Sequence, residues 1–480
     1  MPAKGSQIAI RQSGESERLP RQQRRQQMRK QQVAEVVAIE GAEQYRGGAS
    51  CRIHRPGVAM GVIGFFKITS AVVRCTISPT IPDKRSAKPL ASHLMKHTKP
   101  SFFILIALIG GLAILSSTLS KTPVLPLFAQ SLHASPAEIG WIVMASTIPG
   151  VLISYPAGAL SDTLGHRRVL LASLVVFATA PFLYLLIETA WQLMAVRFYH
   201  GFATAIFGTV ASAAIAERYT TDRAARLSTY SSVTIVWRSI APFLGGFLIS
   251  LASFHAVYIA CAISGVLALG AGLLLDDDPP VSTVKRERPP FWNSLNTVLR
   301  NRGIMLVSLI EAAQYLVFGA IEAFLALFAA SLGIPAWQIG VILGVQLLSI
   351  VFAKPLMGRV SDRVGRRQVI IPGLLVGAAS VALLPHAPGF FGLSVLSLVF
   401  GIGFATVTSS TAALVADLTR DGRYGSSMGV LRTVMDVGQS IGPVLTGWMV
   451  GMAGYGSAFT LLAAILLFSA LLLGLLFRDA

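Results

Sequence analysis

The stretch GALSDTLGHRR at residues 158–168 recurs as GRVSDRVGRR at residues 358–367, an offset of 200 positions. Both copies follow a long apolar run and share the pattern Gly-x-x-Ser-Asp-x-x-Gly-x-Arg. Further along the chain, Pro242-x-x-x-Gly246 matches Pro443-x-x-x-Gly447 at an offset of 201. Matches this regular indicate that the chain contains two copies of one structural unit.

Composition points to a membrane protein. Of the 480 residues, 53% are hydrophobic and only 13% are charged, whereas soluble proteins carry about 25% charged residues. The three cysteines form no CxxC pair, so we expect no disulfide framework, no metal site and no cofactor.

The net charge of +18 does not indicate nucleic-acid binding, because much of it lies in a polar leader. Residues 18–32 read RLPRQQRRQQMRKQQ, a composition typical of a disordered tail. We therefore expect residues 1–94 to be a disordered, dispensable extension, with a start at Met95.

Apolar runs of span length recur from Phe102 onward. They predict an all-α membrane protein with twelve transmembrane helices, because lipid offers backbone groups no hydrogen-bond partners. The expected spans are 102–129, 138–160, 168–187, 190–216, 228–251, 253–275, 303–330, 338–358, 368–387, 389–416, 425–451 and 455–477. Residues 95–275 and 303–480 form two pseudo-symmetric six-helix bundles in this interpretation, and the Pro-rich segment 276–302 is a cytoplasmic linker.

The loops predict the orientation. With a cytoplasmic N-terminus, every inner loop carries arginine or lysine and the outer loops carry none. This asymmetry follows the positive-inside rule and places both termini in the cytoplasm, in an inner (plasma) membrane protein.

The two Gly-x-x-Ser-Asp loops resemble the signature between spans 2 and 3, and between spans 8 and 9, of the major facilitator superfamily. The resemblance covers Ser101 to the C-terminus. The run Leu193-x-x-x-Arg197-x-x-x-Gly201 is similar to the superfamily's motif in span 4. In spans 5 and 11, APFLGG at 241–246 and Gly438-x-x-x-Gly442-Pro443 resemble the antiporter motif, although Ala241 replaces its usual glycine.

This resemblance implies a secondary transporter that works by alternating access, most like the twelve-helix drug:proton antiporter branch. We expect proton-coupled efflux of small organic molecules by a monomer in the bilayer. A metabolite or sugar symporter or uniporter of the same fold is the alternative. A polytopic membrane transferase, or any other enzyme, is not expected, because the short loops carry no catalytic set. The resemblance assigns helix-packing roles to Gly201, Pro242, Gly246, Gly442 and Pro443.

The repeated loops are candidate gates. Gly158 and Gly358 are expected to end their helices, and Gly165 and Gly365 to form tight inner turns. Asp162 is expected at the positive N-terminus of span 11, and Asp362 at that of span 5. The alternative is that the loop arginines, including Arg167 and Arg367, only set the topology.

Charges within spans are candidate functional groups, because burying them in lipid is costly. The candidates for substrate or proton coupling are Arg197, Arg238, Glu311, Glu322 and Asp436. Several have structural alternatives. Lys354 is expected to snorkel to the inner headgroups, and Arg432 to neutralise Asp436 at i,i+4. Glu311 suits a titrating group or a packed, paired carboxylate equally.

Lys121 and Glu322 are expected to form an outer gate. They lie about 28–30 Å from the inner ends of spans 1 and 7 at 1.5 Å per residue, and the repeat offset relates them almost one to one. We expect the pair to form when the protein faces inward. The alternative is two independent charges that snorkel to the outer headgroups.

Overall fold

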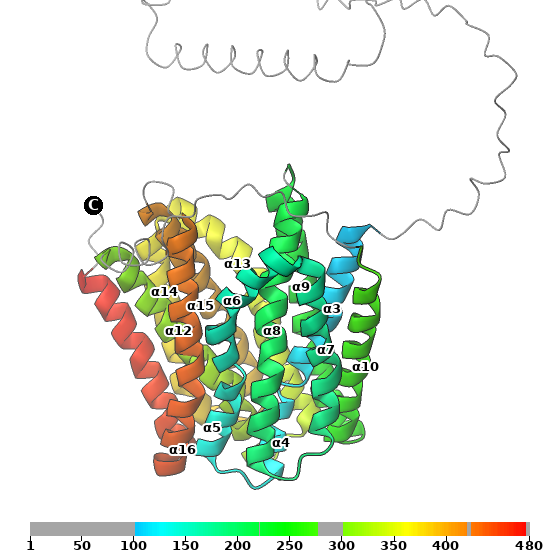
Figure 1. The fold of residues 1–480 in the computed structure, drawn as a ribbon. Helices are drawn as coiled ribbons and strands as arrows, with labels where there is room; N and C mark the ends of the chain where they lie inside the picture. The colour runs from blue at the N-terminus through cyan, green and yellow to red at the C-terminus, as the bar shows by residue number, and fades with distance from the viewer. Residues whose placement is uncertain (1–100, 220, 277–300, 420–423, 477–480) are drawn as a thin grey trace, which may run out of the picture. The chain divides into compact units, whose positions relative to one another are not determined.

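The computed structural model describes residues 101–219, 221–276, 301–419 and 424–476. Its secondary structure there is helical throughout (Figure 1). The expected extension 1–94 and most of the expected linker 276–302 lie outside the described residues, as does the side chain of Asp162. The elements are α3 (Phe102–Leu119), α4 (Val124–Ser131), α5 (Pro136–Ala145), α6 (Ile148–Leu164), α7 (His166–Tyr184), α8 (Ala190–Arg218), α9 (Arg223–Leu251), α10 (Phe254–Leu273), α12 (Arg302–Ser331), α13 (Ala336–Val364), α14 (Arg366–Leu383), η3 (Leu384–His386), α15 (Gly389–Leu418) and α16 (Tyr424–Leu476).

These elements form the twelve predicted spans. Ten helical segments of the described chain are long and apolar enough to cross a membrane. The short helices α5 and α6 make one more crossing together. The last helix, α16, makes two crossings, because its 53 residues extend about 80 Å and it turns at Gly454 (φ 79°). The chain is therefore a multi-pass membrane protein.

Two spans that we expected to be continuous are interrupted. Residues 120–123 separate α3 from α4, and Ser146 and Thr147 separate α5 from α6. Proline explains both breaks, because it lacks an N–H and fits only the first turn of a helix. Pro123 is the N-cap of α4, and Pro149 lies in the first turn of α6. The breaks present Lys121 and Ser146 to the interior.

The repeated loops end their helices later than expected. Gly158 and Gly358 lie inside α6 and α13, which continue to Leu164 and Val364, so the prediction that these glycines end the helices was wrong. The true stops are Gly165 (φ 88°) and Gly365 (φ 112°). Both adopt left-handed backbone, which favours glycine.

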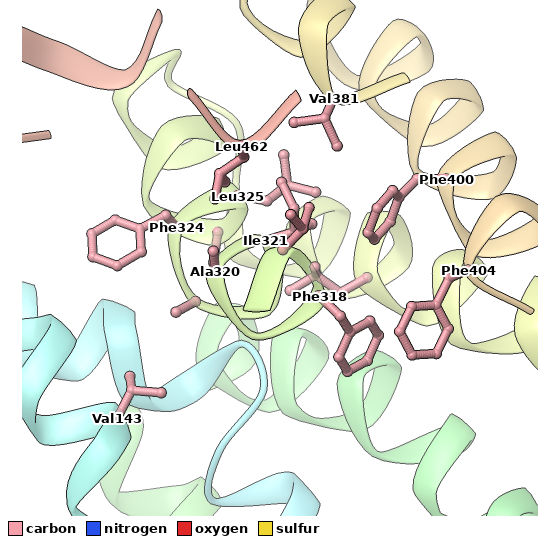
Figure 2. Close-up of a cluster of buried hydrophobic side chains, with 14 of the residues drawn as sticks. Val143, Phe318, Ala320, Ile321, Phe324, Leu325, Val381, Phe400, Phe404 and Leu462 are labelled. Carbon is pink, nitrogen blue, oxygen red and sulfur yellow. The ribbon is translucent and has the colours of Figure 1, made fainter. Parts of the chain in front are cut away.

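The core surrounds α12. Every residue of this helix from Val317 to Ala329 is buried, as expected for a helix enclosed on all sides. Figure 2 shows Phe318 beside Phe404 of α15, with ring centroids 4.5 Å apart, and Phe324 pointing the opposite way. This helix therefore links the C-terminal bundle to the surface between the halves.

The two halves meet mainly through three helix pairs, α9 with α13, α5 with α16, and α4 with α12, and α6 also contacts α16. We call the end with the arginine-rich loops the inner end and the opposite end the outer end. The contacts of α5 with α16 and of α9 with α13 lie near the outer starts of α5 and α13. The helices α4 and α5 reach the same end of the bundle (Figure 1).

Glycines allow these helices to touch. A Cβ on Gly340 would clash with the carbonyl oxygen of Pro242 and lie 3.0 Å from Cα of Gly246. On the other side, a Cβ on Gly140 would lie 2.5 Å from the carbonyl oxygen of Pro443. Gly447 packs in the same way on Pro136. We name these contacts the outer seal. Its two sides are related by the sequence repeat.

Candidate functional site

The Lys121–Glu322 pair joins the halves just inside the outer seal. Nζ of Lys121 donates to Oε2 of Glu322 at 2.7 Å, and the hydroxyl of Thr122 donates to Oε1 at 2.9 Å. The Glu322 side chain is 5% exposed and that of Lys121 is 20% exposed. The break after α3 allows this arrangement, because Lys121 leaves the helical path there. The structure thus brings together the two residues that the repeat placed at the same depth.

A small cavity adjoins this pair. It is lined by Val143 of α5 and Gly319 of α12 among others. The lining comes from both halves of the chain. Movement of one half against the other would therefore change this cavity directly.

Arg197 is buried within the N-terminal half. Its guanidinium donates to the Tyr184 hydroxyl at 3.3 Å and to Oγ of Ser146 at 2.8 Å, and the residue is 3% exposed. Gly201, one turn along α8, packs on the carbonyl of Ser146. No carboxylate of a described residue forms an ion pair with Arg197. Its charge is therefore held by neutral oxygens at the break between α5 and α6.

Glu311 is buried in the C-terminal half. The residue is 3% exposed, and its carboxyl group accepts from the Thr411 hydroxyl of α15 at 2.5 Å. Within the described chain it has no basic side chain at ion-pair distance. Its polar neighbours in sequence, Ser308 and Gln314, are also buried and form no side-chain hydrogen bond there. Lys354 lies within electrostatic range of Glu311 but does not form an ion pair with it, so the two alternatives for Glu311, a titrating group or a paired carboxylate, both stay predictions.

Three basic residues of the spans are grouped around Lys354. Arg238 of α9, Lys354 of α13 and Arg432 of α16 are exposed, and Lys354 lies within electrostatic range of both arginines. We name these three residues the central cationic cluster. Lys354 was expected to snorkel to the inner headgroups, but its charged neighbours place it toward the interior instead.

Asp436 is the exposed carboxylate beside this cluster. It lies within electrostatic range of Arg432, but the two side chains do not form the ion pair expected from their i,i+4 spacing. Both are exposed, so hydration competes with a direct contact. The charge of Arg432 is consequently available to other groups.

The inner loops use their charged residues in parallel ways. Arg167 donates to the carbonyl of Leu273 at 3.2 Å, and Arg367 to the carbonyl of Gly474 at 2.5 Å. These carbonyls lie at the C-terminal ends of α10 and α16, where a cation is favourable. The loop arginines therefore hold the last helix of each half.

Asp362 contacts a residue of its own half. It accepts from Arg366 at 2.5 Å, and Arg366 also donates to Asp417 at 2.9 Å. Asp362 was expected at the N-terminus of span 5, but it makes no hydrogen bond to the first turn of α9 among the residues described. Arg366, four residues further along the chain, donates to the Asp362 carboxylate instead. The same expectation for Asp162 falls on an undescribed side chain.

One contact of the N-terminal half was not predicted. His166 lies 2.5 Å from Glu217, and these residues occupy the positions equivalent to Arg366 and Asp417. The signal was available in the repeat, because both pairs are separated by 51 positions. It was missed because histidine replaces arginine in the first copy.

The packing motifs act between helices. Gly442 packs on the carbonyl of Leu316, and Gly438 on that of Ala312, so α16 and α12 approach closely. Pro242 and Pro443 supply the carbonyls that meet Gly340 and Gly140 in the outer seal. In the described residues, no group of His, Cys, Asp or Glu is arranged to hold a metal.

Comparison with known proteins identifies relatives of this architecture. A family model for the Major Facilitator Superfamily matches residues 106–343 and 307–480. An uncharacterised MFS-type transporter of Methanocaldococcus jannaschii is 22% identical over 70% of this chain and 88% of its own length. The quinolone resistance protein NorA of Staphylococcus aureus is 23% identical over 68% of this chain and 84% of its own. The crystal structure of the nucleoside transporter NupG superimposes with a TM-score of 0.66 at 15% identity, over 79% of this chain and all of NupG.

Proposed function

The chain belongs to the Major Facilitator Superfamily and is thus a membrane transporter rather than an enzyme, and on that premise we propose that it exports small organic molecules in exchange for protons. The similarity to a quinolone resistance protein supports the direction of transport and the substrate range. The observation that carries the proton exchange is the setting of Glu311.

Glu311 suits a proton carrier. An ionised carboxylate in a protein interior costs several kcal/mol unless a cation compensates it. Glu311 accepts a hydrogen bond from Thr411 and has Lys354 within electrostatic range, but no cation at ion-pair distance among the described residues. A proton removes that cost. Because α12 also packs directly on α16, protonation of Glu311 affects a helix at the boundary between the halves.

The outer seal and the Lys121–Glu322 pair support an alternating-access cycle. Together they join the halves at the outer end, and in this proposal that closure belongs to the inward-facing form. The inner ion pairs Arg366–Asp362 and His166–Glu217 lie within their own halves and leave the halves free to separate there. In this proposal the substrate enters from inside, and opening of the seal releases it outside.

The arginine-rich loops support a plasma-membrane protein with both termini in the cytoplasm. Each half supplies its own side of the seal and of the Lys121–Glu322 pair, so one chain contains a complete pathway. We therefore propose that the monomer is the working unit.

The test is transport in everted membrane vesicles with norfloxacin as the probe. An acidic lumen should drive uptake by the wild-type protein, and collapse of the pH gradient should abolish it. A symporter of the same fold would instead lose norfloxacin from an acidic lumen. Uptake that ignores the pH gradient would refute proton exchange.

Glu311→Gln identifies the proton carrier. This variant should lose uptake driven by the pH gradient, yet retain exchange of labelled for unlabelled norfloxacin, which needs no net proton movement. Glu188→Gln is the matched control, because Glu188 is exposed in an outer loop. Gradient-driven uptake that survives in Glu311→Gln would exclude this carboxylate.

A further inference from the structure

The central cationic cluster is only partly compensated by the described carboxylates near it, because its three cations and Lys121 share Glu311, Glu322 and Asp436. Arg238, Lys354 and Arg432 form no hydrogen bond or ion pair with any described residue. Glu322 pairs with Lys121 at 2.7 Å and also lies within electrostatic range of Arg238. Glu311 is buried against Thr411 and lies within electrostatic range of Lys354 without forming an ion pair with it. Asp436 alone remains exposed beside the three cations.

The three residues of the cluster lie at different depths between the inner end and the outer seal. Arg238 lies four residues inward of Pro242 on α9, which is about 6 Å along the helix. Arg432 lies about 16 Å inward of Pro443 on α16, and Lys354 about 21 Å inward of Gly340 on α13. Arg238 belongs to the N-terminal half and is within electrostatic range of Lys354 in the other half. Arg432 and Lys354 thus lie at similar depths, and Arg238 lies nearer the outer seal but still within electrostatic range of Lys354.

An aromatic surface lies next to these charges. Tyr315 is within electrostatic range of Arg238, Arg432 and Asp436. Its ring centroid is 5.0 Å from that of Phe404, which in turn stacks near Phe318 (Figure 2). The protein can thus contact the apolar or aromatic body and the anionic group of one ligand at a similar depth in the membrane.

The repeat argues that the fold does not require these charges. By the offsets of the repeat, Arg238 corresponds to Gln439, Arg432 to Ser231 and Lys354 to Ser154. The other half of the protein builds the same helices without a cation at any of these positions. Like charges that repel each other in a membrane protein are costly, and this makes a ligand of opposite charge the natural partner.

We propose that the central cationic cluster binds an anionic group of the substrate, so that this protein exports amphipathic organic anions and zwitterions rather than cations. The inference rests on the proposed export function and names its substrate class. The anionic group lies between Arg238, Lys354 and Arg432, and the apolar body contacts Tyr315. An inside-negative membrane potential then favours export, because it drives negative charge outward.

Binding of three dansyl probes of matched size to the purified protein tests this proposal. Dansylglycine carries a carboxylate, dansylamide is neutral and dansyl-ethylenediamine is a cation. We expect dansylglycine to bind at least tenfold more tightly than dansylamide, and dansyl-ethylenediamine to bind most weakly. Added salt should weaken the binding of dansylglycine and leave that of dansylamide unchanged. A wild-type protein that binds the three probes alike, or prefers the cation, overturns the proposal.

Variants locate the site. Arg238→Gln, Lys354→Gln and Arg432→Gln should each weaken dansylglycine binding about fivefold to tenfold, with less than a twofold effect on dansylamide. Asp436→Asn should have the opposite sign and tighten dansylglycine binding. Arg302→Gln, at the exposed inner end of α12, is the matched control and should change neither. Thermal melting of each variant verifies folding, and unchanged dansylglycine binding in folded variants overturns the proposal.

The binding measurement requires no proton gradient, so it separates this inference from the proposed function. Charge-selective binding without gradient-driven transport would refute proton exchange and leave the anion site in place. Gradient-driven transport of norfloxacin with charge-blind binding would refute only the anion site.

Discussion

Neutralising Lys121 should open the outer end of the protein. Lys121→Met leaves the Glu322 carboxylate, 5% exposed, with the Thr122 hydroxyl as its remaining partner. Removing one member of a buried ion pair costs about 3–5 kcal/mol. Because Lys121 is 20% exposed and the Thr122 bond survives, we expect about 2 kcal/mol here, since exposed pairs contribute less.

This cost destabilises only the form in which the outer end is closed, because water would solvate Glu322 in the open form. A difference of about 2 kcal/mol corresponds to a shift of roughly 30-fold in the population of the open form. Thr122→Val removes a hydrogen bond and keeps the ion pair, so its effect should be smaller, about 1 kcal/mol.

Labelling of a cysteine at Val143 measures the opening. This side chain is buried at the cavity beside the pair, and Figure 2 shows it directed toward α12. In a background with the native cysteines replaced by serine, Val143→Cys should react slowly with a membrane-impermeant maleimide from outside. Lys121→Met should raise the labelling rate by roughly 30-fold, in line with the population of the open form.

Charge exchange provides the decisive control. Lys121→Glu and Glu322→Lys should each label rapidly and transport poorly, and the double exchange should recover part of both properties. Recovery should be incomplete, because a lysine at position 322 no longer accepts from Thr122. Single variants that label as slowly as the parent, or a double exchange no better than the worse single variant, would refute the outer gate.

Three further predictions concern the seal, the buried arginine and the inner loop. Gly340→Val should hold the outer seal open and reduce transport at least tenfold, because its side chain would meet α9. Gly270→Ala is the control, since a Cβ there meets nothing within 4 Å. Equal transport rates in the two variants would count against the seal. Arg197→Lys should insert normally but lose about tenfold in transport, because an ammonium lacks the planar fork that reaches both Tyr184 and Ser146; wild-type rates at equal expression would remove Arg197 from the cycle. Asp362→Asn should slow turnover by a few-fold with unchanged membrane insertion, as read from initial rates of norfloxacin uptake, and an unaltered rate would leave the Arg366 contact without a role in cycling.

Much of the fold could be predicted from the sequence, because the relevant physics is local along the chain. A bilayer demands about 20 apolar residues per crossing, so span positions follow from hydropathy. The repeat relates distant positions by their offset alone, and this offset places Lys121 and Glu322 at nearly the same depth. The tight turns at Gly165 and Gly365 followed from glycine's access to positive φ.

The tertiary structure decided which partner each charged group chooses. Proline breaks moved Lys121 and Ser146 out of their helices, and the helical stop lay at Gly165 rather than Gly158 because sequence spacing does not reveal which glycine takes positive φ. Asp362 forms an ion pair with Arg366, whereas Arg432 forms none with Asp436. Both pairs are four residues apart in the sequence. A spacing of four residues makes such contacts possible, but competition from solvent and from other helices decides whether they form.

The sequence by itself determined the number of spans, the twofold repeat and the short set of charges within the spans. Three features depend on tertiary packing: Glu311 is buried with no cation at ion-pair distance among the described residues, Arg238 lies within electrostatic range of Lys354 from the other half, and glycines close the outer end. Hydropathy is a sum along the chain and is insensitive to neighbours far away in sequence. The environment of a charge is a property of three-dimensional packing, and in this protein that packing joins residues about 100 to 300 positions apart.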